Sequence, residues 1–288
     1  MAKKAAPTKH LRKAIRVDPV DGGVELADYS PRKTPVGPDS KKDALKALKS
    51  LGSELMDLQE RLYAGGTAGD PRNVLLVLQG MDTSGKGGVI EHVVGLVGPE
   101  GTHIRAFKKP TEEERAHDFL WRIRRELPGP GMIGVFDRSH YEDVLVTAVH
   151  DQIDDAERNR RYQLINKFEA ELAAAGTTVI KCFLNISYDE QRERLLARLD
   201  DQTKHWKFNV GDIAERRLWP RYQQFYAQAL AATSTETAPW YAIPSDHKWY
   251  RNWAVAVLLR DALRDLDPSY PDTDLDIPQL KRRLAPPN

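Results

Sequence analysis

One short segment constrains the fold of this chain more than any other. The apolar residues 74–78 form a run of strand length and lead directly into the sequence GMDTSGK at 80–86, which helix-like sequence follows. This sequence matches G-x-x-x-x-G-K, the loop whose backbone N–H groups cradle phosphate oxygens where a helix begins. A plain glycine turn is the alternative, but the strand before it favours the phosphate-binding loop. We expect Gly85 to belong to that backbone, and Lys86 to place its charge on the transferred phosphate.

The loop departs from its usual form at two positions. Gly87 stands where a Ser or Thr hydroxyl usually reaches Mg²⁺, and Asp82 lies inside the loop. A carboxylate facing phosphates is repulsive, by about 1–4 kcal/mol at ~4 Å depending on the dielectric. A divalent cation between the two removes this repulsion. Asp82 is therefore a candidate metal ligand that replaces the missing hydroxyl, while Gly87 stays a phosphate-binding backbone position.

Segments of strand length alternate with helical patterns along the rest of the chain. We expect strands at about 74–78, 103–107, 132–136, 178–184 and 240–243, and helices at about 40–64, 111–126, 155–175, 187–199, 212–232 and 246–266. Such alternation predicts right-handed crossovers and a parallel sheet that helices cover on both faces. The leucine stripe at 45–62 is interpreted as a core face, with binding of a partner helix as the alternative. The fold class is α/β.

A dense set of polar residues follows the expected strand 132–136. Asp137 stands at its carboxyl end, which is the edge where open α/β sheets bind ligands. A surface turn would explain one or two of the polar residues at 138–143, but the whole set favours a site. We expect Asp137 to act on a metal or an acceptor oxygen, and Arg138 on phosphate charge, because its guanidinium is planar and bidentate.

Two further regions are rich in basic residues. Lys108 and Lys109 precede the expected helix 111–126, which carries Arg122 seven residues after another arginine and therefore on the same face. This region is either an ordinary solvated helix or a groove for an extended anion. Arg198 and Lys207 lie in a basic segment between two helices, as in the lids of small-molecule kinases, where closure excludes water. An exposed helical hairpin is the alternative there.

Composition excludes several other classes of protein. The formal net charge is +1, which argues against a protein that coats nucleic acid through a large basic excess. The single cysteine, Cys182, allows no intramolecular disulfide. No apolar run approaches the roughly 20 residues needed to cross a bilayer, so we expect a cytoplasmic protein without a membrane partner. Residues 1–39 are interpreted as a basic N-terminal arm, either a solubilising tail or a collector of polyanions, and 268–288 as a loose C-terminal tail.

In combination, these motifs resemble the polyphosphate kinase 2 family. The resemblance rests on GMDTSGKG at 80–87, FDRSHYED at 136–143, and WKF at 206–208 followed by APW at 238–240. It implies a P-loop kinase-like three-layer fold over residues 40–267, with a helical lid at about 195–220. It also implies reversible, Mg²⁺-dependent phosphoryl transfer, with Mn²⁺ as a substitute, between inorganic polyphosphate and ADP, AMP or their guanine counterparts, by a homo-oligomer.

The resemblance also assigns roles to residues. Asp82 and Asp137 look like the metal and acceptor-phosphate carboxylates of the family, and Lys86 and Arg138 like its phosphate clamps. The segment 139–144 is similar to that of members that accept both AMP and ADP. We expect phosphate or polyphosphate contacts from Gly85, Gly87, Lys108, Lys109, Arg122, Arg198 and Lys207, and nucleotide contacts from Thr83, Ser84, Tyr141 and Glu142.

Two other functions share parts of this pattern. An ATP-dependent nucleoside-monophosphate kinase has the same loop, lid and fold. A regulatory or polyphosphate-binding protein derived from the P-loop fold is the non-enzyme alternative. Asp82, Lys86 and Asp137 together speak against that last option, because binding alone does not need all three.

Overall fold

The computed structural model describes residues 9–19 and 22–285, and its centre is a parallel sheet. The strands are β1 (Asn73–Gln79), β2 (Thr102–Ala106), β3 (Ile133–Asp137), β4 (Thr177–Asn185) and β5 (Trp240–Pro244). Within these residues the order is β2-β3-β1-β4-β5, with every neighbouring pair parallel. The predicted α/β class and the five predicted strands are confirmed.

The central strand β1 is buried on both faces, as its unbroken apolar run predicted. Leu76 belongs to one hydrophobic cluster, whereas its neighbours Leu75 and Val77 belong to the other. Side chains alternate across a strand, so one run of apolar residues supplies both cores. In register, Leu78 of β1 lies opposite Asp137 of β3, which aligns the carboxyl ends of the two strands.

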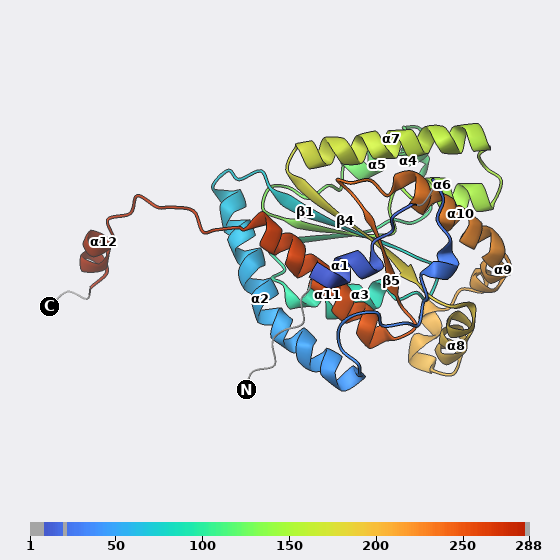
Figure 1. Cartoon of the computed structure of the whole chain (residues 1–288). Helices are drawn as coiled ribbons and strands as arrows, with labels where there is room; N and C mark the ends of the chain where they lie inside the picture. The colour runs from blue at the N-terminus through green and yellow to red at the C-terminus, as the bar shows by residue number, and fades with distance from the viewer. Residues whose placement is uncertain (1–8, 20–21, 286–288) are drawn as a thin grey trace.

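Helices cover the two faces of the sheet in separate layers (Figure 1). One layer contains α2 (Lys41–Thr67), α3 (Lys86–His92) and α11 (Lys248–Leu266), and the other contains α5 (Trp121–Arg124), α6 (Glu142–Val149), α7 (Asp155–Ala174) and α10 (Trp219–Thr233). Most side chains of α11 are buried. On α2, Leu51, Leu55 and Leu62 of the leucine stripe are also buried, so both helices pack within the chain. The stripe is a core face, as interpreted.

Two helices that the sequence predicted as continuous are broken. The segment 111–126 contains only α4 (Glu112–Arg115) and α5, because the side chain of Asp118 accepts a hydrogen bond from the amide of Leu120 at 3.0 Å and forms a local turn instead. The segment 212–232 divides into α9 (Gly211–Arg217) and α10. Pro220 opens α10, where its missing N–H costs little, but it cannot continue a preceding helix.

The two terminal segments differ from each other. α1 (Lys9–Ile15) packs on the sheet with Leu11 buried, and the amide of Val17 donates to the carbonyl of Trp240 in β5 at 2.8 Å. The beginning of the described arm is thus packed against β5, whereas its later part contacts the start of α11, where the Tyr250 hydroxyl donates to the carbonyl of Val36 at 2.9 Å. Residues 1–8, 20 and 21 of the predicted arm lie outside the described range. Residues 267–276 lead outward to α12 (Ile277–Leu284), which stands away from the body (Figure 1). Among the helices that the structure describes, none is long and apolar enough to cross a membrane.

Three short 3-10 helices complete the described chain between the larger elements. They are η1 (Leu26–Asp28), η2 (Val94–Leu96) and η3 (Gln202–Lys207). η3 follows α8 (Tyr188–Leu199) and precedes α9, so the predicted lid is built from the end of one helix, a 3-10 turn and a short helix. Figure 1 places α8 and α9 together at the carboxyl ends of the strands.

Candidate active site

The phosphate-binding loop connects β1 to α3 at the carboxyl edge of the sheet. Within it, the backbone φ of Thr83 is 65° and that of Gly85 is 109°. A Cβ atom on Gly85 would lie 1.7 Å from Nη1 of Arg251, so only glycine fits there. The amide of Ser84 donates to the carbonyl of Met81 at 3.0 Å, which closes the turn. The loop is therefore compact, and Arg251 of α11 packs against it.

The ammonium group of Lys86 lies across its own loop. Its Nζ atom donates to the carbonyl oxygen of Gly80 at 2.7 Å and to that of Met81 at 3.4 Å. Burial, and after it the nearby Arg138, lower the pKa of Lys86. Both acceptors are neutral, so the charge of this lysine is not already satisfied by a direct ion pair. A phosphate group that enters the loop meets a desolvated cation.

The end of β3 provides the facing half of the site. Arg138 follows Asp137 and adopts a φ of 64°. Its Nη2 atom lies 3.0 Å from Oδ1 of Asp82 in the loop, and its Nε atom lies 3.7 Å from Oε2 of Glu142. The structure thus brings the predicted loop carboxylate into direct contact with the predicted arginine. A strained backbone held at such a position is common in functional sites.

The two candidate metal ligands are Asp82 in the loop and Asp137 at the end of β3. In the described residues no group of three or more His, Cys, Asp or Glu side chains could hold a metal ion by itself. Mg²⁺, however, is usually held by one or two carboxylates together with substrate phosphates and water. The Oδ1 atom of Asp137 is buried without a hydrogen-bond partner, and about a third of the Asp82 side chain is exposed. These donors fit Mg²⁺ bound together with a phosphate.

Tyr141 does not lie where a nucleotide could touch it, so that prediction is wrong. Its ring is fully buried, and its hydroxyl donates to Oε1 of Glu169 at 2.8 Å. The Nζ atom of Lys181 lies 2.9 Å from the Tyr141 hydroxyl and 2.6 Å from Oε2 of Glu169, and it donates to the carbonyl of Thr233 at 2.7 Å. These buried groups join the start of α6 to α7, β4 and α10. Tyr141 therefore anchors the segment that carries Arg138.

The other three predicted nucleotide contacts are divided. Ser84 is fully buried, and its hydroxyl lies within the loop, so direct contact with a nucleotide is not supported. Thr83 is almost fully buried, and its carbonyl accepts a hydrogen bond from Arg194 at 2.8 Å. Glu142 lies at the site with part of its carboxylate exposed, and burial raises its pKa in spite of the neighbouring Arg138. Of the four residues, Glu142 is the best placed to meet a substrate.

The proposed cationic groove is only partly present. Lys108 and Lys109 are exposed, as a channel wall requires. Arg122 is not, because its side chain is 6 % exposed and its Nη2 atom lies 3.0 Å from Oδ2 of Asp143. It also donates to the carbonyl of Lys108 at 2.9 Å. The prediction that Arg115 and Arg122 share one helical face is wrong, because the helix is broken between them. Arg122 is instead buried in an ion pair.

The two predicted lid residues, Arg198 and Lys207, differ in their contacts. The Nη1 atom of Arg198 lies 3.7 Å from Oδ2 of Asp212 on α9 and donates to the carbonyl of Lys207 at 3.2 Å. The ammonium group of Lys207 lies over the exposed ring of Trp206, 4.9 Å from its centroid. Lys207 is therefore open to solvent, whereas Arg198 already has a carboxylate neighbour.

Several side chains at the site had no clear signal in the sequence. The Nε2 atom of Gln79 donates to Oε1 of Glu142 at 2.9 Å. Arg194 of α8 is buried against the loop and donates to two of its carbonyls. Arg251 lies in the apolar segment 246–266 and reaches the same loop. Position after a strand could have indicated Gln79, but no local pattern indicates which arginine of an apolar helix meets a loop 167 residues away.

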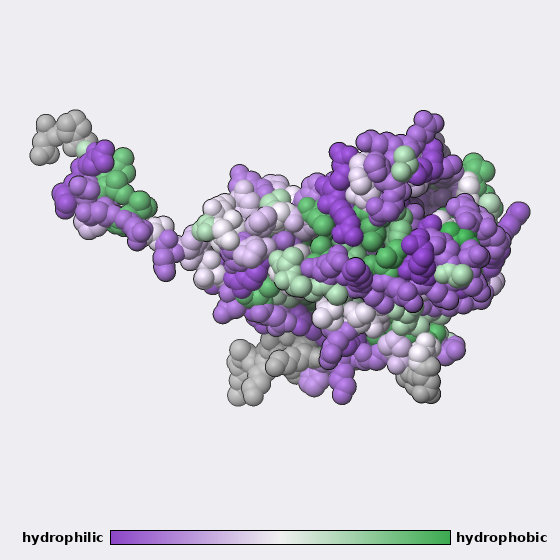
Figure 2. All heavy atoms as spheres, turned by 90° about the horizontal axis from the view of Figure 1, so that it is seen from above, coloured by the Kyte–Doolittle hydropathy of each residue, from purple (hydrophilic) through white to green (hydrophobic). Residues whose placement is uncertain are grey.

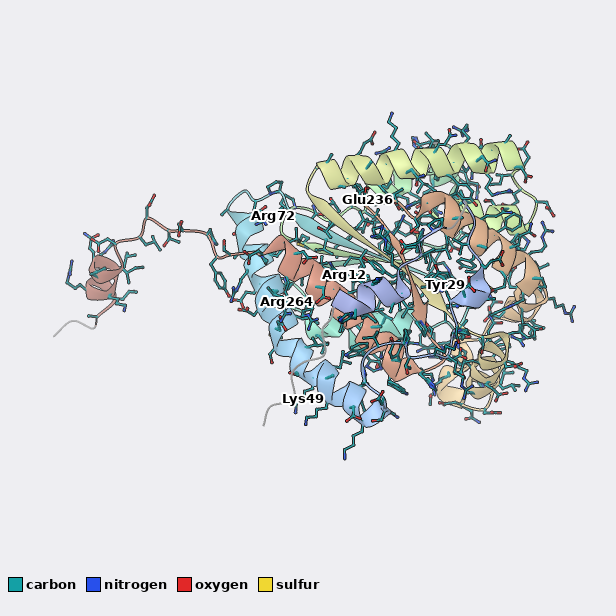
Figure 3. All side chains as sticks on the ribbon, viewed as in Figure 1. Arg12, Tyr29, Lys49, Arg72, Glu236 and Arg264 are labelled. Atoms are coloured by element: carbon teal, nitrogen blue, oxygen red, sulfur yellow. The ribbon has the colours of Figure 1, made fainter. Side chains whose placement is uncertain are left out.

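A separate cavity of about 730 Å³ lies at the opposite end of the sheet. Arg12 and Glu236 line it (Figure 3), together with Tyr241 and the start of β4. Its charges are partly paired, because Arg12 contacts Asp265 and Arg16 lies 2.7 Å from Asp18. Ligands of open parallel sheets bind at the carboxyl ends of the strands, so this cavity is not the site of the chemistry.

A loop shaped for phosphate oxygens, facing carboxylates and a guanidinium, is suited to moving a phosphoryl group between two bound phosphates. The fold and the site therefore define a phosphotransferase of the P-loop kinase class. The family described as polyphosphate kinase 2 (PPK2) matches residues 39–271. This chain belongs to the polyphosphate kinase 2 family.

Individual relatives are similar over nearly their whole length. The AMP/ADP-polyphosphate phosphotransferase of Meiothermus ruber is 47 % identical over 91 % of this chain and 96 % of its own. The ADP-polyphosphate phosphotransferase of Rhodopseudomonas palustris is 40 % identical over 88 % of this chain and 91 % of its own. The crystal structure of polyphosphate kinase 2 from Arthrobacter aurescens is 48 % identical and has a TM-score of 0.92, covering 95 % of this chain and 96 % of that one.

Proposed function

We propose that this protein transfers phosphoryl groups between inorganic polyphosphate and both AMP and ADP. The family and the names of the relatives support polyphosphate as the phosphate source and nucleotides as acceptors. The observation that carries the assignment of the site is the 3.0 Å contact between Arg138 and Asp82, which joins the loop to the end of β3. The relative named for both AMP and ADP is more similar than the one named for ADP alone, which supports both acceptors.

The side chains divide the work of transfer. Lys86 and Arg138 neutralise charge on the transferred group from two sides, and the loop backbone orients it. Phosphoryl transfer needs mainly positioning and charge neutralisation, so no covalent enzyme intermediate is required. The exposed Lys108, Lys109 and Lys207 supply positive charge outside this centre, where a linear polyanion would extend.

Asp82 and Asp137 would hold Mg²⁺, or Mn²⁺ in its place, together with substrate phosphates. The unpartnered, buried Oδ1 atom of Asp137 supports this role, as does the position of Asp82 inside a phosphate-binding loop. A bound divalent ion offsets the repulsion between these carboxylates and the phosphates and polarises the phosphoryl oxygens. Arg138 holds Asp82 in place by its direct contact.

One assay separates this function from the alternative. Purified protein is mixed with Mg²⁺, AMP or ADP, and polyphosphate, with no ATP added, and nucleotides are followed by chromatography. We expect ADP and ATP to form from AMP, and ATP to form from ADP. If no product forms from polyphosphate while ATP phosphorylates a nucleoside monophosphate, the protein is an ATP-dependent nucleoside-monophosphate kinase instead.

Assembly and location complete the proposal. We infer a homo-oligomer in which α12 packs on a second copy of the chain. Its apolar residues Ile277, Leu280 and Leu284 share one face, no side chain of α12 is buried, and the helix stands away from the body (Figure 2). We also infer a cytoplasmic location, in keeping with a single, buried, unpaired cysteine.

A further inference from the structure

Besides Arg194, a second buried arginine, Arg251, contacts the phosphate-binding loop. Arg251 belongs to the first turn of α11, and its side chain is buried at 2 % exposure. Its Nη1 atom donates to the carbonyl oxygen of Ser84 at 3.2 Å. A Cβ atom on Gly85 would lie 1.7 Å from Nη1, and one on Gly88 would lie 2.6 Å from Nη2. The guanidinium therefore fills the space that two loop glycines leave.

This contact acts on the part of the loop that meets phosphate. A trans peptide unit points its C=O and N–H groups in opposite directions. Arg194 donates to the same Ser84 carbonyl, also at 3.2 Å. When Arg251 and Arg194 together hold this carbonyl, the N–H of Gly85 points the other way, into the loop. Backbone N–H groups in this orientation are what the loop offers to phosphate oxygens. Arg251 thus orients a phosphate ligand without touching the phosphate.

The charge of Arg251 has no carboxylate beside it. Its Nε and Nη2 atoms donate to Oδ1 of Asn252, a neutral amide, at 3.1 and 2.8 Å. Among the described residues, none of the ion pairs involves Arg251. Burial first, and the nearby Arg194 second, lower its pKa to about 9. A buried cation without a counter-charge is unfavourable in the free protein.

Two other buried arginines show that this arrangement is not a general property of the fold. Arg194 donates to carbonyls of the same loop, but its Nε atom lies 2.9 Å from Oε1 of Glu190. Arg260 lies on the same helix as Arg251, and its Nη2 atom lies 2.6 Å from Oδ1 of Asp261. Of the three, only Arg251 lacks a carboxylate, and it lies behind the segment 84–88.

We propose that Arg251 is a positioning residue that fixes the Ser84–Gly85 peptide for phosphate and whose buried charge is neutralised when phosphates fill the loop. The anion that compensates it is the substrate. Binding energy is then gained twice, because the phosphates meet an oriented loop and also relieve an unfavourable charge. The proposal rests on the loop being the phosphate site of the transfer reaction.

The test compares Arg251→Met, Arg251→Lys and the control Arg260→Met in the full chain. Melting temperatures are measured without ligand and with inorganic tripolyphosphate and Mg²⁺, since a ligand that binds only the folded state raises the melting temperature. We expect Arg251→Met to melt at or above the wild-type temperature without ligand, yet to lose most of the rise that tripolyphosphate produces. Its KM for polyphosphate should increase about tenfold or more, and Arg251→Lys should recover part of that loss. Arg260→Met should melt earlier but keep the full rise.

Three results would overturn the proposal. Arg251→Met could keep the full tripolyphosphate rise and the wild-type KM, which would show that the loop does not use this residue. It could melt well below Arg260→Met, which would make Arg251 an ordinary structural cation. If tripolyphosphate fails to raise the melting temperature even of the wild type, the loop is not the phosphate site, and the proposed function fails together with this inference.

Discussion

Asp82 is the residue at which this phosphate-binding loop differs most from the usual one. If it holds Mg²⁺ in place of the missing hydroxyl, Asp82→Asn should reduce Mg²⁺-supported turnover by about 10²-fold, or about 3 kcal/mol. The melting temperature should change little, because the carboxylate is partly exposed and contacts only Arg138 across the site. Turnover is measured over a range of Mg²⁺ concentrations. Near-normal rates at low Mg²⁺ would contradict the assignment.

Gly87 offers a second, independent test of the same idea. A Cβ atom at this position meets nothing within 4 Å, so Gly87→Ser should fold normally and place a hydroxyl where most such loops have one. We expect the double variant Asp82→Asn with Gly87→Ser to be about tenfold more active than Asp82→Asn alone. The matched control is Gly129→Ser, which lies outside the loop and whose Cβ likewise meets nothing within 4 Å. Equal effects of the two serines would show that no specific ligand had been restored.

Lys109 and Arg122 should now behave differently, although the sequence placed them in one groove. Lys109→Ala should raise the KM for long polyphosphate and reduce its salt sensitivity, because an exposed cation is lost from the path of a polyanion. Arg122→Ala should instead lower stability by about 3 kcal/mol, since it leaves Asp143 without its buried partner. Urea unfolding and initial rates at two salt concentrations separate the two effects. If Arg122→Ala instead raised the KM for polyphosphate without lowering stability, Arg122 would belong to the polyphosphate groove.

At the residue scale, the sequence predicted what local pattern determines. Asp82 and Lys86 lie in the loop and helix start after β1, and Asp137 and Arg138 lie at the end of β3. Parallel strands end at one edge of the sheet, so the proximity of these residues could be foreseen. Tyr141 could not be placed correctly, because a polar residue at a strand end can turn inward as well as outward. Its partners Glu169 and Lys181 come from α7 and β4, and only the packed layers bring them together.

At the scale of elements, the sheet was easier to predict than the short helices. All five strands were foreseen. A buried strand such as β1 or β3 is a continuous apolar run between turns, whereas β2 is largely exposed and has no such run. The break at 116–120 was missed because its cause is a single hydrogen bond that the side chain of Asp118 accepts from the amide of Leu120. Pro220 could have indicated the second break, since proline inside a helical pattern usually marks a boundary. The packing of α1 on β5 was missed because the composition of a basic segment does not reveal where it docks.

A variant of Glu169 on α7 tests how much the buried ion pair with Lys181 stabilises the packing of the β3–α6 segment. Glu169→Gln should lower the free energy of unfolding by about 3 kcal/mol at pH 7, because Lys181 would stay buried without its carboxylate. Burial alone would raise the pKa of Glu169, but Lys181 and His140 outweigh it and hold that pKa below its ordinary value of 4.5. The stabilisation is therefore present above pH 4.5 and is lost as the pH falls through the folded-state pKa.

Urea unfolding at a series of pH values checks this expectation. The difference between wild type and Glu169→Gln should be full near neutral pH and should shrink below pH 4.5. The control is Glu171→Gln on the same helix, where the carboxylate is half exposed and lies 3.8 Å from Arg124. It should change stability by less than about 0.5 kcal/mol. A similar loss in both variants would mean that α7 responds to any lost charge.

For the molecule as a whole, the exposed α12 is the feature that a single chain does not explain. An eight-residue helix is too short to be stable alone in water. None of its side chains is buried, and Leu284 is 84 % exposed. Burying such a side chain contributes about 1.5–3 kcal/mol. In a symmetric pair each copy would bury the helix of the other, so the gain counts twice.

We expect the proposed oligomer to depend on the apolar face of α12 more than on α2 or α11, whose leucines are buried within the chain. We expect light scattering on the full chain to give a multiple of 32.6 kDa, and the double variant Leu280→Glu with Leu284→Glu to shift the mass toward one copy. Leu275→Glu is the matched control, because Leu275 is exposed but precedes the helix. A wild-type mass near 32.6 kDa would exclude the oligomer. An unchanged multiple in the double variant would place the contact on another surface.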